Sequence, residues 1–186
     1  MDKFKPDIET DLELINQLDL RMAPGKYSEV GFRRIDENLR DICLRDSKYL
    51  AEQNVTHEQI GDYLDSVITR ANFVKSTYMN KTFRSLDDII PSVIIDNKVN
   101  VRLHSATKGY QICPFSDNNN NLCGRGCAEY IITNLRTGKQ IIVSTLHSHL
   151  IRDHHFFEGN TQYRLEPYDA IQVLEIEPNI NYKHET

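Results

Sequence analysis

The sequence has no long apolar run and no apolar N-terminal segment. None of its hydrophobic stretches approaches the ~20 residues that a membrane-spanning helix needs. Residues 1–6 are polar, so the start of the chain lacks the apolar core of a secretory signal peptide. We therefore expect a cytoplasmic protein that neither spans a membrane nor is secreted by that route.

An excess of positive charge is also missing. The chain has 22 Lys and Arg residues against 27 Asp and Glu, which gives a net charge of −5 and a pI near 5.8. A broad surface for nucleic acid or for an anionic membrane needs the opposite balance. The helix expected after Thr56 carries Arg70 but also three acidic residues, which make a poor phosphate-facing surface. We expect neither nucleic acid nor a membrane as a partner.

The short signatures of common enzyme classes are absent as well. The sequence contains no His-Glu-x-x-His, no nucleophile elbow, no phosphate-binding loop and no dinucleotide-binding glycine motif. The segment Gly124-Arg125-Gly126 is too short to count as one. Motifs of this kind therefore assign no reaction to the chain.

What is present is the composition of a soluble globular protein. The 186 residues are 39% hydrophobic and 26% charged, and the length suits one domain or one domain with a small appendage. A chain of this length buries ~70% of its unfolded surface, so folding alone requires neither a disulfide nor a metal. A metal site in such a chain would therefore call for an explanation of its own.

The apolar pattern of residues 1–85 predicts a helical region. Apolar residues recur near helical spacing over residues 37–53, where Asp36 is placed to cap the start. Thr56-His57-Glu58-Gln59 has the pattern of a capping box, so a second helix is expected after Thr56 and through about Val74, with His57 on its surface. Residues 11–20 predict a shorter helix.

Residues 86–186 predict a mainly antiparallel sheet followed by helices. Residues 134–139 are expected to form a hairpin loop with Gly138 at positive φ, and the polar run 117–121 predicts another loop. The expected strands are residues 93–95, 99–103, 109–112, 130–133 and 141–143, and the expected helices are residues 147–157 and 168–174. The predicted fold class is therefore α+β, with a helical region packed on a β-rich Cys/His region, as two units or as one continuous domain.

Metal-binding side chains gather late in the chain. Three of the four Cys residues and six of the seven His residues lie in residues 91–186. Their order is a Cys-bearing loop, a β-hairpin and a His-bearing helix, which many small zinc modules use. Zinc prefers thiolate and imidazole ligands, and a tetrahedral site needs four. Our first choice of ligands is Cys113, Cys123, His149 and His154.

The three late cysteines have more than one use open to them. Cys123 and Cys127 are spaced as in common zinc loops, whereas the nine residues between Cys113 and Cys123 would have to loop out. Cys127 therefore competes with Cys113. Buried apolar thiols and a redox pair of Cys123 with Cys127 are alternatives. Disulfides are less expected, because a signal peptide is missing and Cys43 is remote.

The histidine spacing also leaves alternatives open. His149 and His154 lie about 140° apart on an ideal helix, so the end of the helix must tighten or break to bring them together. His147 competes with His149, and His154 as a hydrogen-bonded core residue is the plain alternative. Asp153, four residues after His149, is either a ligand or the acceptor that orients an imidazole.

Residues 149–159 resemble a segment found in a group of small uncharacterised bacterial proteins, His-Leu-Ile-Arg-Asp-His-x-Phe-Phe-Glu-Gly. The resemblance covers residues 110–170 and includes Tyr-Arg-Leu-Glu-Pro at 163–167. It implies a bacterial protein and a peripheral place for Cys127, and it carries no activity. The resemblance also implies that six residues belong to one module, namely His149, Arg152, Asp153, His154, Phe156 and Glu158.

We interpret the sequence as a zinc-binding, non-enzymatic module in which the metal joins the Cys loop to the His helix and which acts through protein partners. A closed four-ligand site does no chemistry by itself. The alternative is a metal-dependent hydrolase with an open ligand position for water and with Glu158 or Asp153 as general base. The ligands in that alternative are His147, His149 and His154.

Overall fold

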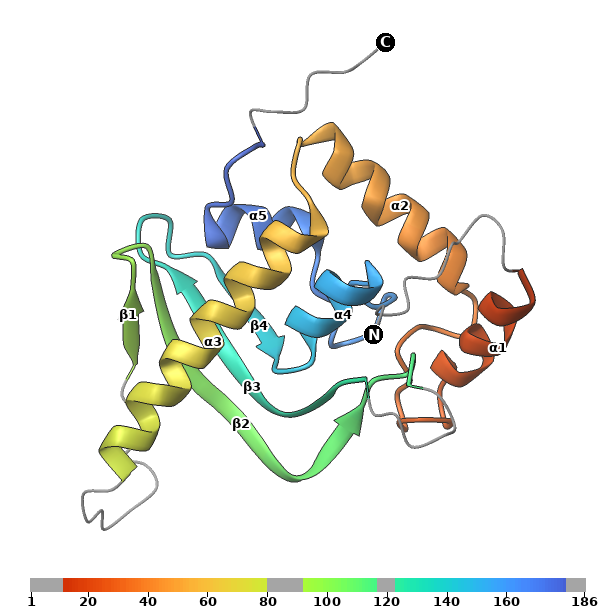
Figure 1. The fold of residues 1–186 in the computed structure, drawn as a ribbon, viewed down its shortest axis with the longest axis horizontal. Helices are drawn as coiled ribbons and strands as arrows, with labels where there is room; N and C mark the ends of the chain where they lie inside the picture. Colours follow the sequence, from red (N-terminus) through yellow and green to blue (C-terminus); the bar gives the residue numbers. More distant parts are fainter. Residues whose placement is uncertain (1–11, 80–91, 117–122, 180–186) are drawn as a thin grey trace.

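The computed structural model describes residues 12–79, 92–116 and 123–179 of the chain (Figure 1). Within these ranges five helices and one four-stranded antiparallel sheet form an α+β fold, as the sequence predicts. The helices are α1 (Leu12–Met22), α2 (Leu39–Glu52), α3 (His57–Met79), α4 (His147–His154) and α5 (Pro167–Leu174). The strands are β1 (Val93–Ile95), β2 (Val99–Ile112), β3 (Arg125–Asn134) and β4 (Gln140–Ser144). The predicted loop at 117–121 lies outside the described residues.

The N-terminal caps of α2 and α3 follow from side-chain hydrogen bonds. At α3 the predicted capping box is confirmed, since Thr56 Oγ1 accepts from Gln59 N–H at 3.2 Å and Gln59 Oε1 accepts from Thr56 N–H at 2.9 Å. At α2 the prediction of Asp36 as cap is wrong. Asn38 occupies that position and its Oδ1 accepts from Asp41 N–H at 2.9 Å, because the helix begins at Leu39.

The strands follow one another in the order β1-β2-β3-β4, and every neighbouring pair is antiparallel. Two of the expected strands are parts of the single long strand β2, whose register with β3 shifts between Leu103 and Ser105 and again between Ala106 and Gln111. Such irregularities bend a strand and increase its twist. The end of β2 stays paired with the start of β3, and the bend carries Cys113 towards α1 and α4 (Figure 1).

The predicted hairpin between β3 and β4 is confirmed. Gly138 adopts a φ of 71°, and its N–H donates to the Asn134 carbonyl at 2.9 Å. The Asn134 side chain accepts backbone hydrogen bonds from Arg136 and Thr137. The tight loop leads the chain directly back along β3 and on to α4.

Two buried clusters form the core, and both draw residues from either side of residue 85. The first lies between the sheet and helices α3 and α5, and it includes Leu64, Ile132 and Ile151. The second joins α1 and α2 to α4 and to the segment after β2, and it includes Cys113 and Leu150. Helix α4 therefore stands between the two clusters and contributes to each.

Helix α4 is shorter than the predicted 147–157. It ends at His154, and His155 adopts a left-handed conformation with a φ of 55°. This break turns Phe157 into the first core cluster. It also stacks the His155 ring on the His57 ring, with the ring centroids 4.1 Å apart. The prediction of a surface position for His57 is wrong, because this residue is only 7% exposed.

Helices α3 and α4 approach closely at a glycine. A Cβ at Gly61 would stand 2.5 Å from Arg152 Cβ and 2.9 Å from the Ser148 carbonyl oxygen. Any larger residue would push α4 away from α3. None of the helices in the described ranges combines the length and the apolar character that membrane spanning requires.

Replacing Thr56 with Ala is expected to lower the free energy of unfolding by about 1 kcal/mol, because it removes the cap of α3. Urea denaturation followed by circular dichroism measures the change. Thr69→Ala is the matched control, since Thr69 is exposed on the same helix and its replacement changes stability by about 0.5 kcal/mol or less. Equal losses in the two variants would contradict the capping role.

Candidate metal centre

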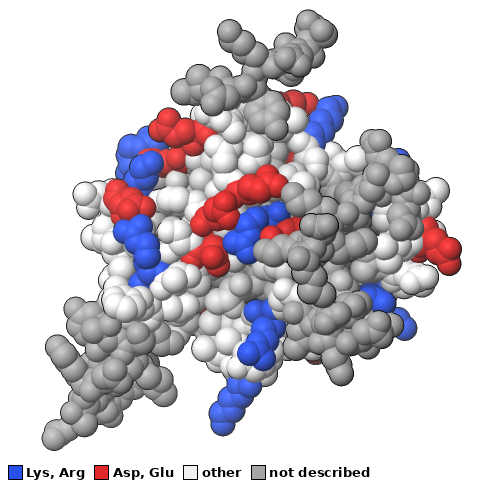
Figure 2. All heavy atoms as spheres, in the orientation of Figure 1, with Lys and Arg blue, Asp and Glu red and all other residues white. Residues whose placement is uncertain are grey.

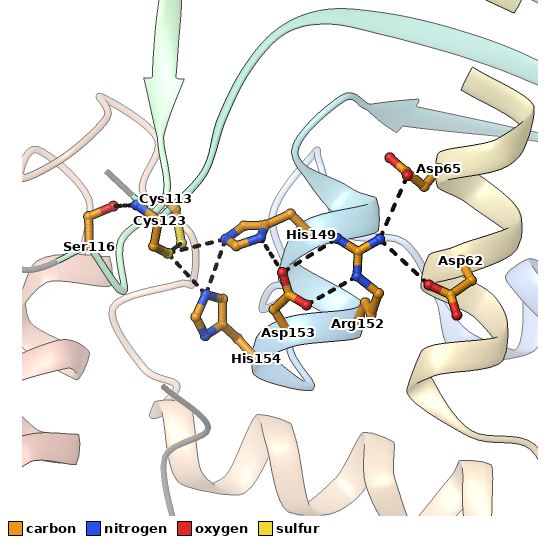
Figure 3. A network of polar contacts seen from close by, with 9 residues as sticks. All are labelled: Asp62, Asp65, Cys113, Ser116, Cys123, His149, Arg152, Asp153 and His154. Atoms are coloured by element: carbon orange, nitrogen blue, oxygen red, sulfur yellow. Dashed lines mark hydrogen bonds and ion pairs between the residues drawn. The ribbon is translucent and has the colours of Figure 1, made fainter. Parts of the chain in front are cut away.

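Four side chains from three segments converge beside α4 (Figure 3). Cys113 follows β2, Cys123 precedes β3, and His149 and His154 belong to α4. One potential ligand atom from each residue lies within 4.8 Å of the other three. These are the four residues that the sequence analysis chose first.

The donor atoms are in direct contact with one another. Cys123 Sγ lies 3.2 Å from Cys113 Sγ, 3.2 Å from His149 Nε2 and 3.2 Å from His154 Nε2. The two imidazole Nε2 atoms are also 3.2 Å apart. Cys123 therefore contacts all three other members of the group.

Backbone hydrogen bonds close the loop that carries the two cysteines. Cys113 N–H donates to the Gly124 carbonyl at 2.9 Å, and Ser116 N–H donates back to the Cys113 carbonyl at 3.0 Å. Cys123 N–H donates to Ser116 Oγ at 3.2 Å. These bonds tie residues 113–116 to residues 123–124. The nine residues that separate Cys113 from Cys123 in the sequence are therefore no obstacle to their contact.

The two imidazoles meet at the C-terminal end of α4, although both residues lie inside the helix. His149 lies within the helix and His154 is its last residue, next to the left-handed His155. Their rings are perpendicular, with centroids 4.8 Å apart. Phe115 stacks on His154 at 4.1 Å and fixes the plane of that ring. The left-handed residue follows both histidines, so the tightened or broken turn that the sequence analysis required does not lie between them, and that prediction was wrong.

A buried carboxylate orients the other imidazole. Asp153 Oδ2 lies 2.7 Å from His149 Nδ1, which leaves Nε2 directed at the cysteines (Figure 3). Arg152 Nε donates to Asp153 Oδ1 at 3.1 Å, and its Nη1 reaches Asp62 and Asp65 of α3 at 3.6 and 3.7 Å. Asp153 therefore lies behind His149 and outside the group of four donors.

The charges of the group favour a thiolate at Cys123. Hydrogen bonding with Cys113, and then with His149 and His154, lowers the pKa of the Cys123 thiol. Burial raises the pKa of the Cys113 thiol, and its hydrogen bond with Cys123 acts in the same direction. Burial opposes the charged form of His149, but the contacts with Cys123 and Asp153 prevail and raise its pKa. A bound cation would be needed for both thiols to ionise together.

The competing ligands lie elsewhere in the described structure. Cys127 is half-buried on β3, where its N–H donates to Thr145 Oγ1 at 3.0 Å. His147 is buried, and its Nδ1 accepts from Ser144 N–H at 2.9 Å while its Nε2 lies 3.3 Å from Glu158 Oε1. Neither belongs to the group of four. All four cysteines of the chain are free.

Sequence reasoning missed the residues that shape the group without being ligands. Gly124 is one, since a Cβ there would stand 2.6 Å from His149 Nε2. Phe115 and Ser116 are the others, because their contacts with His154 and Cys123 join residues far apart in the sequence. The glycine that directly follows Cys123 was the one signal in the sequence for a close approach at this position.

Comparisons of the chain with protein-family models, with curated proteins and with solved structures found no match. The resemblance of residues 149–159 to the bacterial group therefore stays a prediction.

Replacing Gly124 with Ala is expected to lower the free energy of unfolding by about 1–3 kcal/mol, because the new Cβ displaces the His149 ring. Thermal and urea denaturation measure the loss. Gly109→Ala is the matched control, since a Cβ at Gly109 has no described atom within 4 Å. A Gly124→Ala protein as stable as the Gly109→Ala protein would contradict the close approach.

Proposed function

We propose that this chain is a zinc-binding, non-enzymatic module in which a closed Cys₂His₂ centre fastens the loop 113–123 to α4, and which acts through protein partners. The observation that carries the proposal is the convergence of the donor atoms of Cys113, Cys123, His149 and His154, which all lie within 4.8 Å of one another.

The donor set favours zinc over other metals. Two thiolates and two imidazoles match the ligand chemistry of structural zinc, whereas calcium and magnesium prefer oxygen. With Zn–S bonds of about 2.3 Å and Zn–N bonds of about 2.0–2.1 Å, neighbouring donors in a tetrahedral site stand about 3.3–3.8 Å apart. The contacts of 3.2 Å in this group need only small side-chain shifts to reach that spacing.

The arrangement supports a closed site rather than a catalytic one. A hydrolase would leave one coordination position to water, whereas the four protein donors of this group would complete a tetrahedron around a bound ion. Asp153 is hydrogen-bonded to His149 and Arg152, so its role is to orient a ligand rather than to act as a base. His147 and Glu158 face each other away from the four donors.

The zinc would act as a cross-link for the second core cluster. Cys113 belongs to that cluster together with Phe115, Leu146 and Leu150. Binding energy at a structural zinc site contributes directly to folding free energy. The ion would therefore hold the bent end of β2 against α4. The second core cluster at this place is built from several short segments.

The surface of the described residues supports a protein partner. Lys and Arg side chains are interspersed with Asp and Glu on the face shown in Figure 2 and form no broad basic patch there. The register places Ile94 and Ile142 on the sheet face opposite the first core cluster, and these side chains are 60% and 51% exposed. Free thiols at a zinc site also suit the reducing cytoplasm, in which we place the module.

Tag-free protein purified without added metal is expected to contain about one zinc per chain, because four protein donors complete one tetrahedral site. Cys123→Ser and His149→Ala are expected to lose that zinc and to melt at a lower temperature. Elemental analysis and thermal denaturation measure both effects. The matched controls are Cys127→Ser and His104→Ala, whose side chains lie outside the group and leave the zinc content unchanged.

X-ray absorption at the zinc edge separates the two functions that the sequence leaves open. Two sulfur and two nitrogen neighbours are expected for the closed centre. A shell of light neighbours without sulfur, as three histidines and a water would give, would instead favour the hydrolase. Native protein free of metal, with four reactive thiols and a stability insensitive to chelator, would refute the zinc centre itself.

Replacing Asp153 with Asn is expected to weaken zinc binding by about 10- to 100-fold, because the carboxylate that orients His149 loses its charge. Competition with a chromophoric chelator measures the affinity. Asp65→Asn is the matched control, because Asp65 contacts the same Arg152 from the exposed side of α3. The two variants having the same zinc affinity would exclude the orienting role of Asp153.

A further inference from the structure

A pocket separate from the candidate zinc centre opens beside the bent part of the sheet. Its volume is about 500 Å³, which lies within the range typical of small-molecule sites. The pocket is lined by the loop 28–32, the second half of β2, the first half of β3, and the residues Glu158 and Tyr163. None of the four proposed zinc ligands is among its lining residues.

A buried carboxylate forms part of the wall of this pocket. Glu158 is only 4% exposed and adopts a left-handed backbone conformation with a φ of 67°. Its carboxylate accepts a hydrogen bond from Thr161 Oγ1 at 3.3 Å. Arg164, the nearby cation, donates to the backbone carbonyl of Glu158 rather than to its carboxylate, and it pairs with Asp46.

A histidine lies beside the carboxylate of Glu158. His147 Nδ1 accepts a hydrogen bond from Ser144 N–H at 2.9 Å. Its Nε2 is buried without a hydrogen-bond partner in the described structure, and it lies 3.3 Å from Glu158 Oε1. Glu158 is therefore a buried carboxylate with one hydroxyl donor, one imidazole neighbour and no ion pair with a described Lys or Arg.

The other residues that line the pocket also favour a positively charged ligand. Glu129 is half-buried and accepts from Ser105 Oγ at 2.6 Å, and Glu29 lies exposed at the pocket. No Lys or Arg is among the described residues that line the pocket. Phe32 and Tyr163 add aromatic surface, which attracts both alkyl chains and cations.

The carboxylates are arranged for an organic cation rather than a metal ion. Among the described residues, the one set of His, Cys, Asp and Glu donors close enough to hold a metal is the Cys₂His₂ group. The carboxylates of Glu29, Glu129 and Glu158 therefore do not converge on one point. They suit a ligand that carries its charge on an elongated, partly apolar body.

We propose that this pocket binds an alkylammonium group, with the ammonium donating to Glu158 and the alkyl chain lying against Phe32 and Tyr163. The same chemistry is offered by a free aliphatic polyamine and by a lysine side chain of a partner protein. Charge-assisted hydrogen bonds to a desolvated carboxylate are among the strong ones in proteins.

The test uses isothermal titration of the full-length, zinc-loaded protein with three probes. Spermidine represents a free polyamine, Nα-acetyl-lysine methylamide represents a protein side chain, and 1,5-pentanediol is the uncharged control. At least one of the amines is expected to saturate a single site, and the diol is expected not to bind. Saturation by spermidine alone assigns a free polyamine, and saturation by the lysine amide alone assigns a partner's lysine.

Isosteric variants locate the binding. Glu158→Gln keeps the shape of the side chain and is expected to weaken amine binding by about tenfold or more, as the loss of one charge-assisted hydrogen bond implies. Glu129→Gln is expected to weaken it less, and the exposed Glu52→Gln, outside the pocket, is expected not to change it. Circular dichroism shows whether the Glu158→Gln protein folds. If it does not, the loss of amine affinity in Glu129→Gln tests the proposal.

Three outcomes would overturn the proposal. They are the absence of amine binding at millimolar concentration, equal binding of the diol, and amine binding that neither Glu158→Gln nor Glu129→Gln weakens. Saturable calcium binding that both variants abolish, with no amine binding, would make the pocket a metal site and would equally overturn it. Zinc content is measured on the same samples, so failure here is distinguishable from failure of the zinc centre.

Discussion

The contact between the His149 and His154 rings at the end of α4 is the interaction on which the rest of the site depends. The two residues leave an ideal helix about 140° apart, so their side chains must lean towards each other to share an ion. The left-handed residue His155 stops the helix, and Phe115 stacks on the last imidazole and holds it in place. The same break releases the following residues from the helix, so that they can enter the core. The end of α4 thus carries the donor pair and sends the next residues into the core.

The donor group is also fastened to the main body of the fold. Asp153 connects His149 to Arg152, and Arg152 reaches across to the acidic residues of α3. Gly61 allows the two helices to approach closely enough for this contact. The polar chain is exposed at its far end, where its ion pairs contribute little to stability. The role of these contacts is to orient His149. The buried Asp153 carboxylate, held by Arg152, keeps that imidazole turned towards the cysteines.

Local patterns were predictable from the sequence, and tertiary contacts were not. The α+β class, the capping box at Thr56 and the four-donor group follow from periodicity, cap chemistry and ligand order, which are properties of short segments. Asn38 in place of Asp36 as the cap of α2 depended on where the helix begins, and boundaries are weakly encoded. The contact of Gly124 with His149 joins distant residues, so the glycine beside Cys123 could signal a close approach but could not identify the partner.

Neighbouring residues of α4 and of the segment after it belong to different core clusters. Leu150 packs into the second cluster and Ile151 into the first, and Phe156 and Phe157 divide in the same way. Two separate hydrophobic clusters would ordinarily allow a chain to melt in two steps. Here the backbone cannot move out of one cluster without pulling a large side chain out of the other. The two clusters therefore form a single cooperative unit, and a cross-link beside either one resists unfolding of both.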